Sequence, residues 1–413
     1  MKRRVVITGL GAITPLGNNV EDSWNNAKAG KNGIDFITRY DKQLTEVKIA
    51  GEVKDFDFVG FFGRKQVKRL DRFVQLGLIA SKEAVEDSKI DFDEIDRDRM
   101  GVYYGSGIGG LETIADQEDK AKVRGYDRLS PFFIPSAIIN IASGNIAIEY
   151  GITGIATSSV TACASAANSM GEAFRAIRDG YLELALTGGT EASVIPLGIG
   201  GFSVMMALNK SNDPSYASIP FDKNRSGFVM GEGAGTIILE EYEHAKARGA
   251  KIYGEMIGYG ATCDAYHITG PNPEATGAKK CMEMAVNDAG IKFEDVDYIN
   301  AHGTSTPLND KTESLAIKKA FNEHAYKLSI SSTKSMTGHL LGASGAIEAI
   351  YCILATRDNF VPPTINSKEF DENMNLDYTV GVGKEKVVNV AISNSLGFGG
   401  HNATIAFKKY RGE

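Results

Sequence analysis

Short apolar runs alternate along the chain with segments whose apolar residues recur at intervals of three and four. The runs are rich in β-branched residues and predict buried strands, at residues 5–8, 102–104, 184–186, 236–239, 298–299, 328–330 and 388–392. The periodic segments predict amphipathic helices, over residues 73–84, 166–177 and 343–354. This alternation predicts an α/β protein in which helices cover mostly parallel sheets.

Glycine-rich segments punctuate the pattern. The first strand is predicted to stop at residues 9–11, where two glycines suggest a turn. Residues 105–110 follow a predicted strand and formally fit the G-x-G-x-x-G dinucleotide fingerprint. That fingerprint also needs a second strand that ends in an acidic residue further along the chain, but residues 117–120 lie in a charged helical stretch. We therefore expect a tight turn close to something buried.

The chain divides into two loosely similar halves. Each contains a strand, a turn rich in Gly, Thr and Ser that carries a reactive residue, and a helix. A helical run over residues 242–248 ends at Gly249, and no Pro/Ser-rich linker marks a looser junction elsewhere. Because 413 residues exceed one ordinary core, we predict two fused units, residues 1–250 and 251–413, with a shared interface.

Composition and charge narrow the function classes. With 43% hydrophobic and 23% charged residues, the chain can bury a large core. Its net charge of −7 argues against a nucleic-acid partner, and no run reaches the roughly 18 apolar residues of a membrane span. The four cysteines form no C-x-x-C pair, so we expect thiols in a reducing cytoplasm, without a disulfide framework or a metal site.

Cys163 is the candidate nucleophile. It lies between an extended stretch, residues 157–161, and a helix that begins near Ala164 and stops at Gly180. A helix N-terminus favours the thiolate by about 0.3–2 kcal/mol, which corresponds to a pKa shift of about one unit or less. That is too little alone, so a histidine is needed nearby. Taken by itself, the cysteine also fits an inert thiol packed among small neighbours.

Two histidines occur in loops dense with small polar residues. His302 follows the predicted strand 298–299, and open α/β sheets place ligands at such strand ends. His339 precedes the helix that opens near Gly342. Either one, taken alone, also fits a solvated or capping histidine, as His244 and His324 do.

A cysteine with two histidines suits thioester carbon–carbon bond formation. The thiolate would take an acyl group by transthioesterification. A malonyl thioester that loses CO₂ would become an enolate, whose oxyanion two imidazole N–H groups could stabilise. Hydrolysis would need only one histidine, so a Cys-His hydrolase remains an alternative that predicts free acid.

Six segments carry a resemblance that covers nearly the whole chain. They are residues 5–9, 161–163, 227–233, 301–304, 334–339 and 394–400. Together and in this order, they resemble the β-ketoacyl-[acyl-carrier-protein] synthases, in particular the synthase II type of bacterial fatty-acid synthesis. The resemblance implies a thiolase-like fold, in which two similar βαβαβαββ halves form a five-layer αβαβα sandwich, and a homodimer.

The resemblance also implies catalytic roles. Cys163 would be acylated, and His302 and His339 would bind the malonyl carbonyl and promote decarboxylation. Lys334, paired with Glu348, would order the site. The product would be a 3-oxoacyl chain two carbons longer, with release of CO₂, as in fatty-acid elongation.

Further substrate contacts follow from the same resemblance. The backbone N–H groups of Cys163 and Phe398 would form an oxyanion hole, with Phe398 gating the second substrate. Thr304 and Thr306 would bind the pantetheine arm, and Ile108 and Phe202 would line the acyl pocket. Asp264 and Glu348 are further candidates for substrate binding.

The resemblance implies an acyl carrier protein as partner, with substrates on its phosphopantetheine arm and no cofactor of the enzyme's own. Because the carrier is acidic, a local basic patch is expected on this acidic chain. The positions that match the family's docking site are Arg64, Lys65, Lys68, Arg69 and Arg72. Each of them alone also fits a solvated helix face.

Three positions depart from the family pattern, namely Asn309, Gly270 and His401. They leave open a specialised polyketide-like pathway. A thiolase would need a second cysteine near the C-terminus, an initiating synthase would carry Asn at His339, and a non-catalytic chain-length partner would lack Cys163. These residues therefore favour an elongating enzyme.

Overall fold

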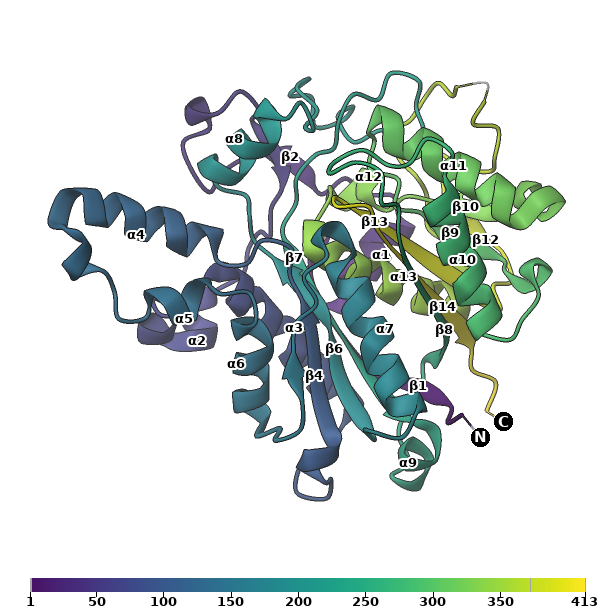
Figure 1. Cartoon of the computed structure of the whole chain (residues 1–413), viewed down its shortest axis with the longest axis horizontal. Coiled ribbons are helices and arrows are strands. Elements are labelled where there is room, and N and C mark those ends of the chain that lie inside the picture. Colours follow the sequence, from purple (N-terminus) through teal and green to yellow (C-terminus); the bar gives the residue numbers. More distant parts are fainter. Residues whose placement is uncertain (1, 372, 413) are drawn as a thin grey trace.

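A computed structural model describes residues 2–371 and 373–412; the outer ends of the two predicted units, Met1 and Glu413, lie outside these ranges. Within these ranges, ten strands form one large sheet (Figure 1). From edge to edge they are β10 (Ser329–Ser331), β9 (Tyr298–Asn300), β13 (Val390–Gly397), β14 (His401–Lys409), β8 (Gly254–Cys263), β1 (Val5–Ile13), β7 (Gly233–Glu241), β6 (Leu184–Glu191), β4 (Met100–Gly105) and β5 (Ala156–Thr157).

The sheet consists of two halves with the same topology. In the N-terminal half, β1 pairs antiparallel with β7 and β7 with β6, whereas β6, β4 and β5 run parallel. In the C-terminal half, β8, β14 and β13 repeat the antiparallel part, and β13, β9 and β10 the parallel part. The edges meet where β1 pairs with β8. The two similar halves are confirmed, but the sheets are mixed, because only the strands joined by crossover helices run parallel.

Helices cover both faces of each half. α3 (Arg72–Ser88) packs on the outside of β1 and β7, and α10 (Thr276–Asp288) packs on the outside of β8 and β14. Between the halves, α7 (Ser165–Arg178) and α13 (Ser344–Asp358) contact strands of both. With α6 (Ile141–Tyr150) and α11 (Pro307–Phe321), each half follows the predicted βαβαβαββ order, and the layered sandwich is confirmed.

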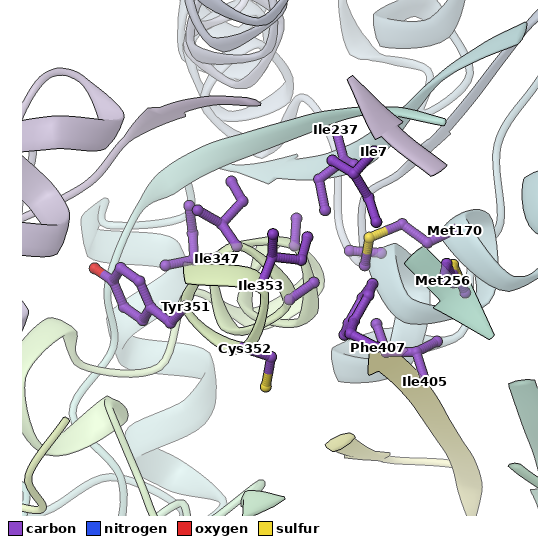
Figure 2. Close-up of a cluster of buried hydrophobic side chains, with 14 of the residues drawn as sticks. Ile7, Met170, Ile237, Met256, Ile347, Tyr351, Cys352, Ile353, Ile405 and Phe407 are labelled. Atoms are coloured by element: carbon purple, nitrogen blue, oxygen red, sulfur yellow. The ribbon is translucent and has the colours of Figure 1, made fainter. Parts of the chain in front are cut away.

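The central layer forms the largest hydrophobic core. Figure 2 shows α13 end-on, with Ile353 on the side of the helix that faces Ile7 of β1 and Phe407 of β14, and Tyr351 on the opposite side. All four belong to one buried apolar cluster. Because strands of both halves reach the same cluster, neither half encloses this core alone.

Two glycines in β1 correct the predicted end of the first strand. The strand continues through residues 9–11 to Ile13. A Cβ on Gly9 would lie 2.3 Å from the carbonyl oxygen of Ala84 in α3, and a Cβ on Gly11 would lie 1.9 Å from that of Ala80. The glycines therefore allow a helix to approach the strand closely, and they do not form a turn.

The second half repeats this arrangement in β8. A Cβ on Gly258 would lie 2.3 Å from the carbonyl oxygen of Ala285, and one on Gly260 would lie 2.1 Å from that of Cys281. Both oxygens belong to α10. The same pair of alternating glycines thus sets the helix-to-strand distance in both halves.

The remaining elements lie around this body, and α4 stands out from it beside α2 and α5 (Figure 1). They are α1 (Val20–Lys28), α2 (Phe58–Val67), α4 (Leu111–Arg124), α5 (Phe133–Ala137), α8 (Pro196–Val204), α9 (Tyr242–Ala247), α12 (Lys334–Thr337) and the small pairs β2 (Ile34–Phe36) with β3 (Ile49–Gly51) and β11 (Phe360–Val361) with β12 (Lys384–Glu385). In the described part of the chain, no helix has the length and apolar character to span a bilayer.

Candidate active site

Cys163 lies on a sharp turn at the start of a buried helix. The turn is the 3-10 segment η4 (Ala162–Ala164), which leads into α7. Ala162 has a φ of 50°, in the left-handed region that costs a non-glycine residue about 1–2 kcal/mol. The predicted place of the cysteine at a helix N-terminus is confirmed, and the residue lines a cavity.

The surroundings of the thiol favour its protonated form. Burial raises the pKa of Cys163 to about 12, and the charge of Lys334 only partly opposes this rise. This direction agrees with the expectation that the helix N-terminus alone is too weak to yield a thiolate, because desolvation favours the neutral thiol. The cysteine needs a base at the moment of attack.

His339 is placed to be that base. Its Nε2 lies 3.0 Å from the sulfur of Cys163, and its Nδ1 lies 2.9 Å from the hydroxyl of Ser344. The backbone N–H of His339 donates to the carbonyl of Val229 at 2.7 Å, and its carbonyl accepts from Gly231 at 2.8 Å. The ring is therefore fixed through both its backbone and its side chain.

His302 lies beside His339 on the wall of the same cavity. Its ring meets that of His339 edge to face, with centroids 5.2 Å apart. The carboxylate of Glu313 accepts hydrogen bonds from the N–H groups of His302 and Gly303, both at 2.8 Å. The turn after β9 is thus held by a buried glutamate that the sequence pattern did not single out.

Both imidazoles are neutral near pH 7. Burial, followed by the charge of Lys334, places the pKa of His302 and of His339 well below the usual range, and His339 adds to the effect on His302. Each neutral ring keeps one N–H that can donate to an oxyanion.

Lys334 is paired as the resemblance implied. Its ammonium group contacts Glu348 Oε1, and both side chains are buried. Burial raises the pKa of Glu348 to about 7 although Lys334 opposes the rise. Glu348 does not line the cavity, which departs from its predicted place at the substrate, and its contact is with Lys334.

Most of the predicted substrate contacts line one cavity of about 390 Å³. Its lining includes Cys163 and both histidines, together with Phe202, Asp264, Thr304, Thr306 and Phe398. Ile108 does not line this cavity and packs in the neighbouring apolar cluster with Phe202. Of the three departures from the family pattern, Gly270 and Asn309 line the cavity and His401 does not.

Two backbone N–H groups face the sulfur. Those of Phe398 and Cys163 hydrogen-bond to it and lower the pKa of the thiol slightly against the effect of burial. A Cβ on Gly397, beside Phe398, would lie 2.8 Å from the carbonyl oxygen of Thr161. A glycine there allows the loop of Phe398 to approach the nucleophile.

The glycine-rich turn after β4 is occupied by a protein carboxylate. Buried Glu191 accepts from the N–H groups of Gly107 at 2.8 Å and of Ile108 and Gly109 at 3.2 Å, and from the hydroxyl of Ser106 at 2.9 Å. The amides that a dinucleotide phosphate would need are already satisfied, as expected for a tight turn beside something buried.

The predicted basic patch divides in two. Arg64, Lys65, Lys68 and Arg69 are exposed on α2 and the turn that follows it. Arg72 departs from the prediction, because its guanidinium group is largely buried in an ion pair with Glu232. It is therefore not available to bind an acidic partner directly.

The donor atoms of Cys163, His302 and His339 all lie within 4.8 Å of one another. This spacing would also suit a metal ion, so the absence of a metal site stays a prediction. The thioester chemistry needs the sulfur free.

Comparison with known proteins decides the family. Residues 2–245 match the family model of the beta-ketoacyl synthase N-terminal domain, and residues 253–368 match that of the beta-ketoacyl synthase C-terminal domain. The chain belongs to the β-ketoacyl synthase family. It is a condensing acyltransferase with a thiolase-like fold.

Relatives with assigned names support this membership over the full length. The chain is 53% identical over 411 residues to 3-oxoacyl-[acyl-carrier-protein] synthase 2 of Synechocystis and 48% identical over 408 residues to that of Staphylococcus aureus, with 99% of each chain covered in both cases. The solved ishigamide ketosynthase/chain length factor superposes with a TM-score of 0.93 at 35% identity and 100% coverage of both chains.

Proposed function

We propose that this β-ketoacyl synthase catalyses the decarboxylative condensation of an acyl chain on Cys163 with malonyl-[acyl-carrier protein]. The observation that carries the proposal is the sulfur of Cys163 lying 3.0 Å from the imidazole of His339, with the imidazole of His302 beside it on the same cavity. One histidine would suffice for hydrolysis, whereas two N–H donors suit an enolate.

The first half-reaction acylates the cysteine. The thiol of Cys163 gives its proton to Nε2 of His339 as the sulfur attacks the thioester carbonyl of the incoming acyl group. The N–H groups of Cys163 and Phe398 stabilise the tetrahedral oxyanion. As the pantetheine sulfur leaves, it takes the proton from His339, which becomes neutral again.

The second half-reaction forms the carbon–carbon bond. The N–H groups of His302 and His339 bind the thioester oxygen of the malonyl group, so that loss of CO₂ leaves an enolate. The enolate carbon attacks the acyl carbonyl on Cys163, the carbon–sulfur bond breaks, and a 3-oxoacyl thioester two carbons longer forms. The sulfur leaves as a thiolate and takes up one proton from water, which restores the thiol. The hydroxyl of Ser344 can donate to or accept from His339 Nδ1, which suits both tautomers.

The substrates would arrive on the phosphopantetheine arm of acyl carrier protein. One similar solved structure, with a TM-score of 0.92 at 33% identity, is described as a type II PKS acyl-carrier protein in complex with its ketosynthase. Thr304 and Thr306 would bind the arm, which their position on the cavity wall supports, with hydroxyls 3.0 Å apart. The exposed Arg64, Lys65, Lys68 and Arg69 would attract the acidic carrier.

A homodimer would cover the edge of the N-terminal half. The edge strand β5 is short, and Ile148, Ile155 and Val160 around it are 79%, 48% and 52% exposed. Exposed apolar residues at an open sheet edge favour pairing with a second copy. We also infer that residues 1–250 and 251–413 form the two units, with the nucleophile on the first and both histidines on the second.

Mass spectrometry of the reaction products tests the proposal. Wild-type protein is given an acyl-carrier thioester and malonyl-carrier thioester beside a Cys163→Ala variant. A carrier-bound 3-oxoacyl product two carbons longer, absent with the variant, is expected. Free acid, or unchanged thioesters across a series of chain lengths, would overturn it. Comparing short saturated chains with polyketide-like 3-oxo starters separates fatty-acid elongation from a specialised pathway.

A further inference from the structure

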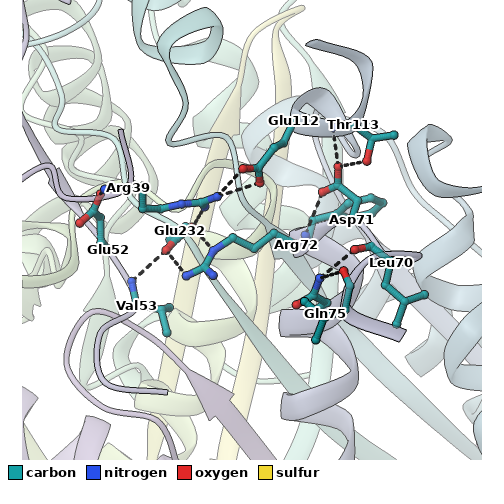
Figure 3. A network of polar contacts seen from close by, with 12 residues as sticks. Arg39, Glu52, Val53, Leu70, Asp71, Arg72, Gln75, Glu112, Thr113 and Glu232 are labelled. Carbon is teal, nitrogen blue, oxygen red and sulfur yellow. Dashed lines mark hydrogen bonds and ion pairs between the residues drawn. The ribbon is translucent and has the colours of Figure 1, made fainter. Parts of the chain in front are cut away.

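A buried carboxylate connects the docking face with the active site. Glu232 lies fully buried just before β7. Arg72 donates to it from Nε at 2.8 Å and from Nη2 at 2.7 Å, and Arg39 Nη1 lies 2.6 Å from Oε2. The N–H of Val53 adds a bond of 3.0 Å. Figure 3 shows both guanidinium groups converging on this one carboxylate.

Glu232 is charged despite its burial. Burial acts to raise its pKa, but the charge of Arg39 and the hydrogen bonds and charge of Arg72 outweigh it and hold the pKa below the usual value. A buried charge of this kind depends on all its partners, because removal of one leaves the others unpaired. The three side chains therefore act as one unit.

On one side, this unit is continuous with the backbone that holds His339. The N–H of Glu232 donates to Gly51 at 2.9 Å, and the N–H of Gly51 donates to Met230 at 2.9 Å. The residues just before Glu232 then hold His339 through the bonds from His339 to Val229 and from Gly231 to His339. A shift of Glu232 would thus move the segment that fixes the base.

On the other side, the unit reaches the docking face. Arg72 is the first residue of α3 and follows the exposed Arg69 by three positions. Arg39 also binds Glu112 in the first turn of α4, at 2.7 and 2.8 Å. The starts of α3 and α4 are therefore both tied to Glu232, α4 through Arg39 and Glu112.

We propose that Glu232 is a positioning residue that keeps His339 Nε2 within reach of the Cys163 sulfur and ties that position to the docking segment. The proposal rests on the proposed function, because it assigns His339 the role of base. Loss of the Glu232 carboxylate should lower kcat about 10- to 100-fold, as small misplacements of reacting groups do. The KM for the carrier should change little, because the exposed basic residues remain.

A matched control lies at the other end of the same strand. Glu240 in β7 is equally buried and is held by Arg248 through Nε and Nη2, both at 2.7 Å. The test compares Glu232→Gln with Glu240→Gln in kcat, KM, Tm and the pH dependence of Cys163 alkylation by iodoacetamide. Alkylation needs no substrate and reports on the contact between Cys163 and His339.

For Glu232→Gln, the expected result is a lower kcat and a shifted pH profile of alkylation. For Glu240→Gln, kcat and the alkylation profile should both stay near wild type, although the loss of Tm should be similar in the two variants. Equal losses of kcat, or an unshifted profile in both variants, would show a merely structural role and overturn the proposal. If Glu232→Gln does not fold, Arg72→Lys, which keeps the charge but loses one hydrogen bond, should show the same shift to a smaller degree. If wild type makes no 3-oxoacyl product while the profiles still differ, the proposed function fails and the positioning role stands.

Discussion

The turns that follow β4 and β9 are built alike but serve different ends. In the N-terminal half, Glu191 accepts the N–H groups of Gly107 and its neighbours. In the C-terminal half, Glu313 accepts those of His302 and Gly303. Each half thus closes the same turn with a buried glutamate.

The difference lies in one side chain. A Cβ on Gly107 would lie 2.9 Å from Glu191 Oε2, so this turn has no room for a side chain. His302, at the comparable place after β9, reaches the cavity. The repeated backbone supplies the frame, and the side chain at one position decides which half contributes an imidazole.

Replacing His302 should have the largest effect on kcat and should separate the two turns most clearly. His302→Ala removes one N–H donor to the enolate and should lower kcat for the 3-oxoacyl product about 10²- to 10³-fold. Ser106→Ala in the matching turn should change it by less than about threefold, because the Ser106 hydroxyl bonds within its own turn, donating to Glu191 and accepting from the N–H of Gly109. Comparable losses in the two variants would mean that the turns share the chemistry.

The paired glycines of β1 and β8 test whether the close helix-to-strand contact contributes equally to stability in the two halves. Gly11→Ala and Gly260→Ala each drive a Cβ into a helix carbonyl and should each lower the free energy of unfolding by about 3 kcal/mol. Urea unfolding measures this. Gly200→Ala, where nothing lies within 4 Å, is the control and should not destabilise. A large loss in only one of the two strands would contradict equivalence.

A glycine substitution should destabilise the protein more in the turn before α13 than in the turn before α7. Leu341 has a φ of 48° at the start of α13, as Ala162 has before α7. Leu341→Gly relieves this strain but removes a buried side chain, and should cost about 2 kcal/mol. Ala162→Gly relieves similar strain and should leave stability within about 1 kcal/mol of wild type. Thermal unfolding would refute this reasoning if Ala162→Gly cost more than Leu341→Gly.

The smallest expected effect is a shift in the pH dependence of Cys163 alkylation when a charge near the sulfur is removed. Glu191 raises and Lys334 lowers the pKa of Cys163. Alkylation by iodoacetamide should therefore begin at lower pH in Glu191→Gln, because a negative charge is lost, and at higher pH in Lys334→Met, because a positive charge is lost. Alkylation rates between pH 7 and 11 measure this, and shifts of the opposite sign would contradict the assigned charges.

Much of the architecture was predictable from local patterns. The apolar runs located β1, β4, β6, β7, β9, β10 and β13, because buried strands concentrate β-branched residues. The helical periods located α3, α7 and α13. The prediction failed in β8, which contains none of the predicted apolar runs, because its glycines serve a helix contact made far along the chain.

The active-site side chains were predictable as candidates, but their protonation was not. Loops rich in small residues pointed to Cys163, His302 and His339. The direction of the thiol pKa depends on burial, which no local pattern shows. Glu191, Glu313 and Ser344 were missed for a related reason, since a single Glu or Ser within a helix or strand carries no signal until folding brings it to its partner.

The shared core has a consequence for the history of the chain. α7 of the N-terminal half packs on α13 of the C-terminal half, and a Cβ on Gly345 in α13 would lie 3.1 Å from the backbone nitrogen of Ala167 in α7. Pairing of β1 with β8 continues this contact at the sheet edges. Such self-complementary contact is the geometry of a two-fold dimer, so the molecule carries inside one chain what has the form of an ancestral subunit interface, with the nucleophile on one side and the two imidazoles on the other.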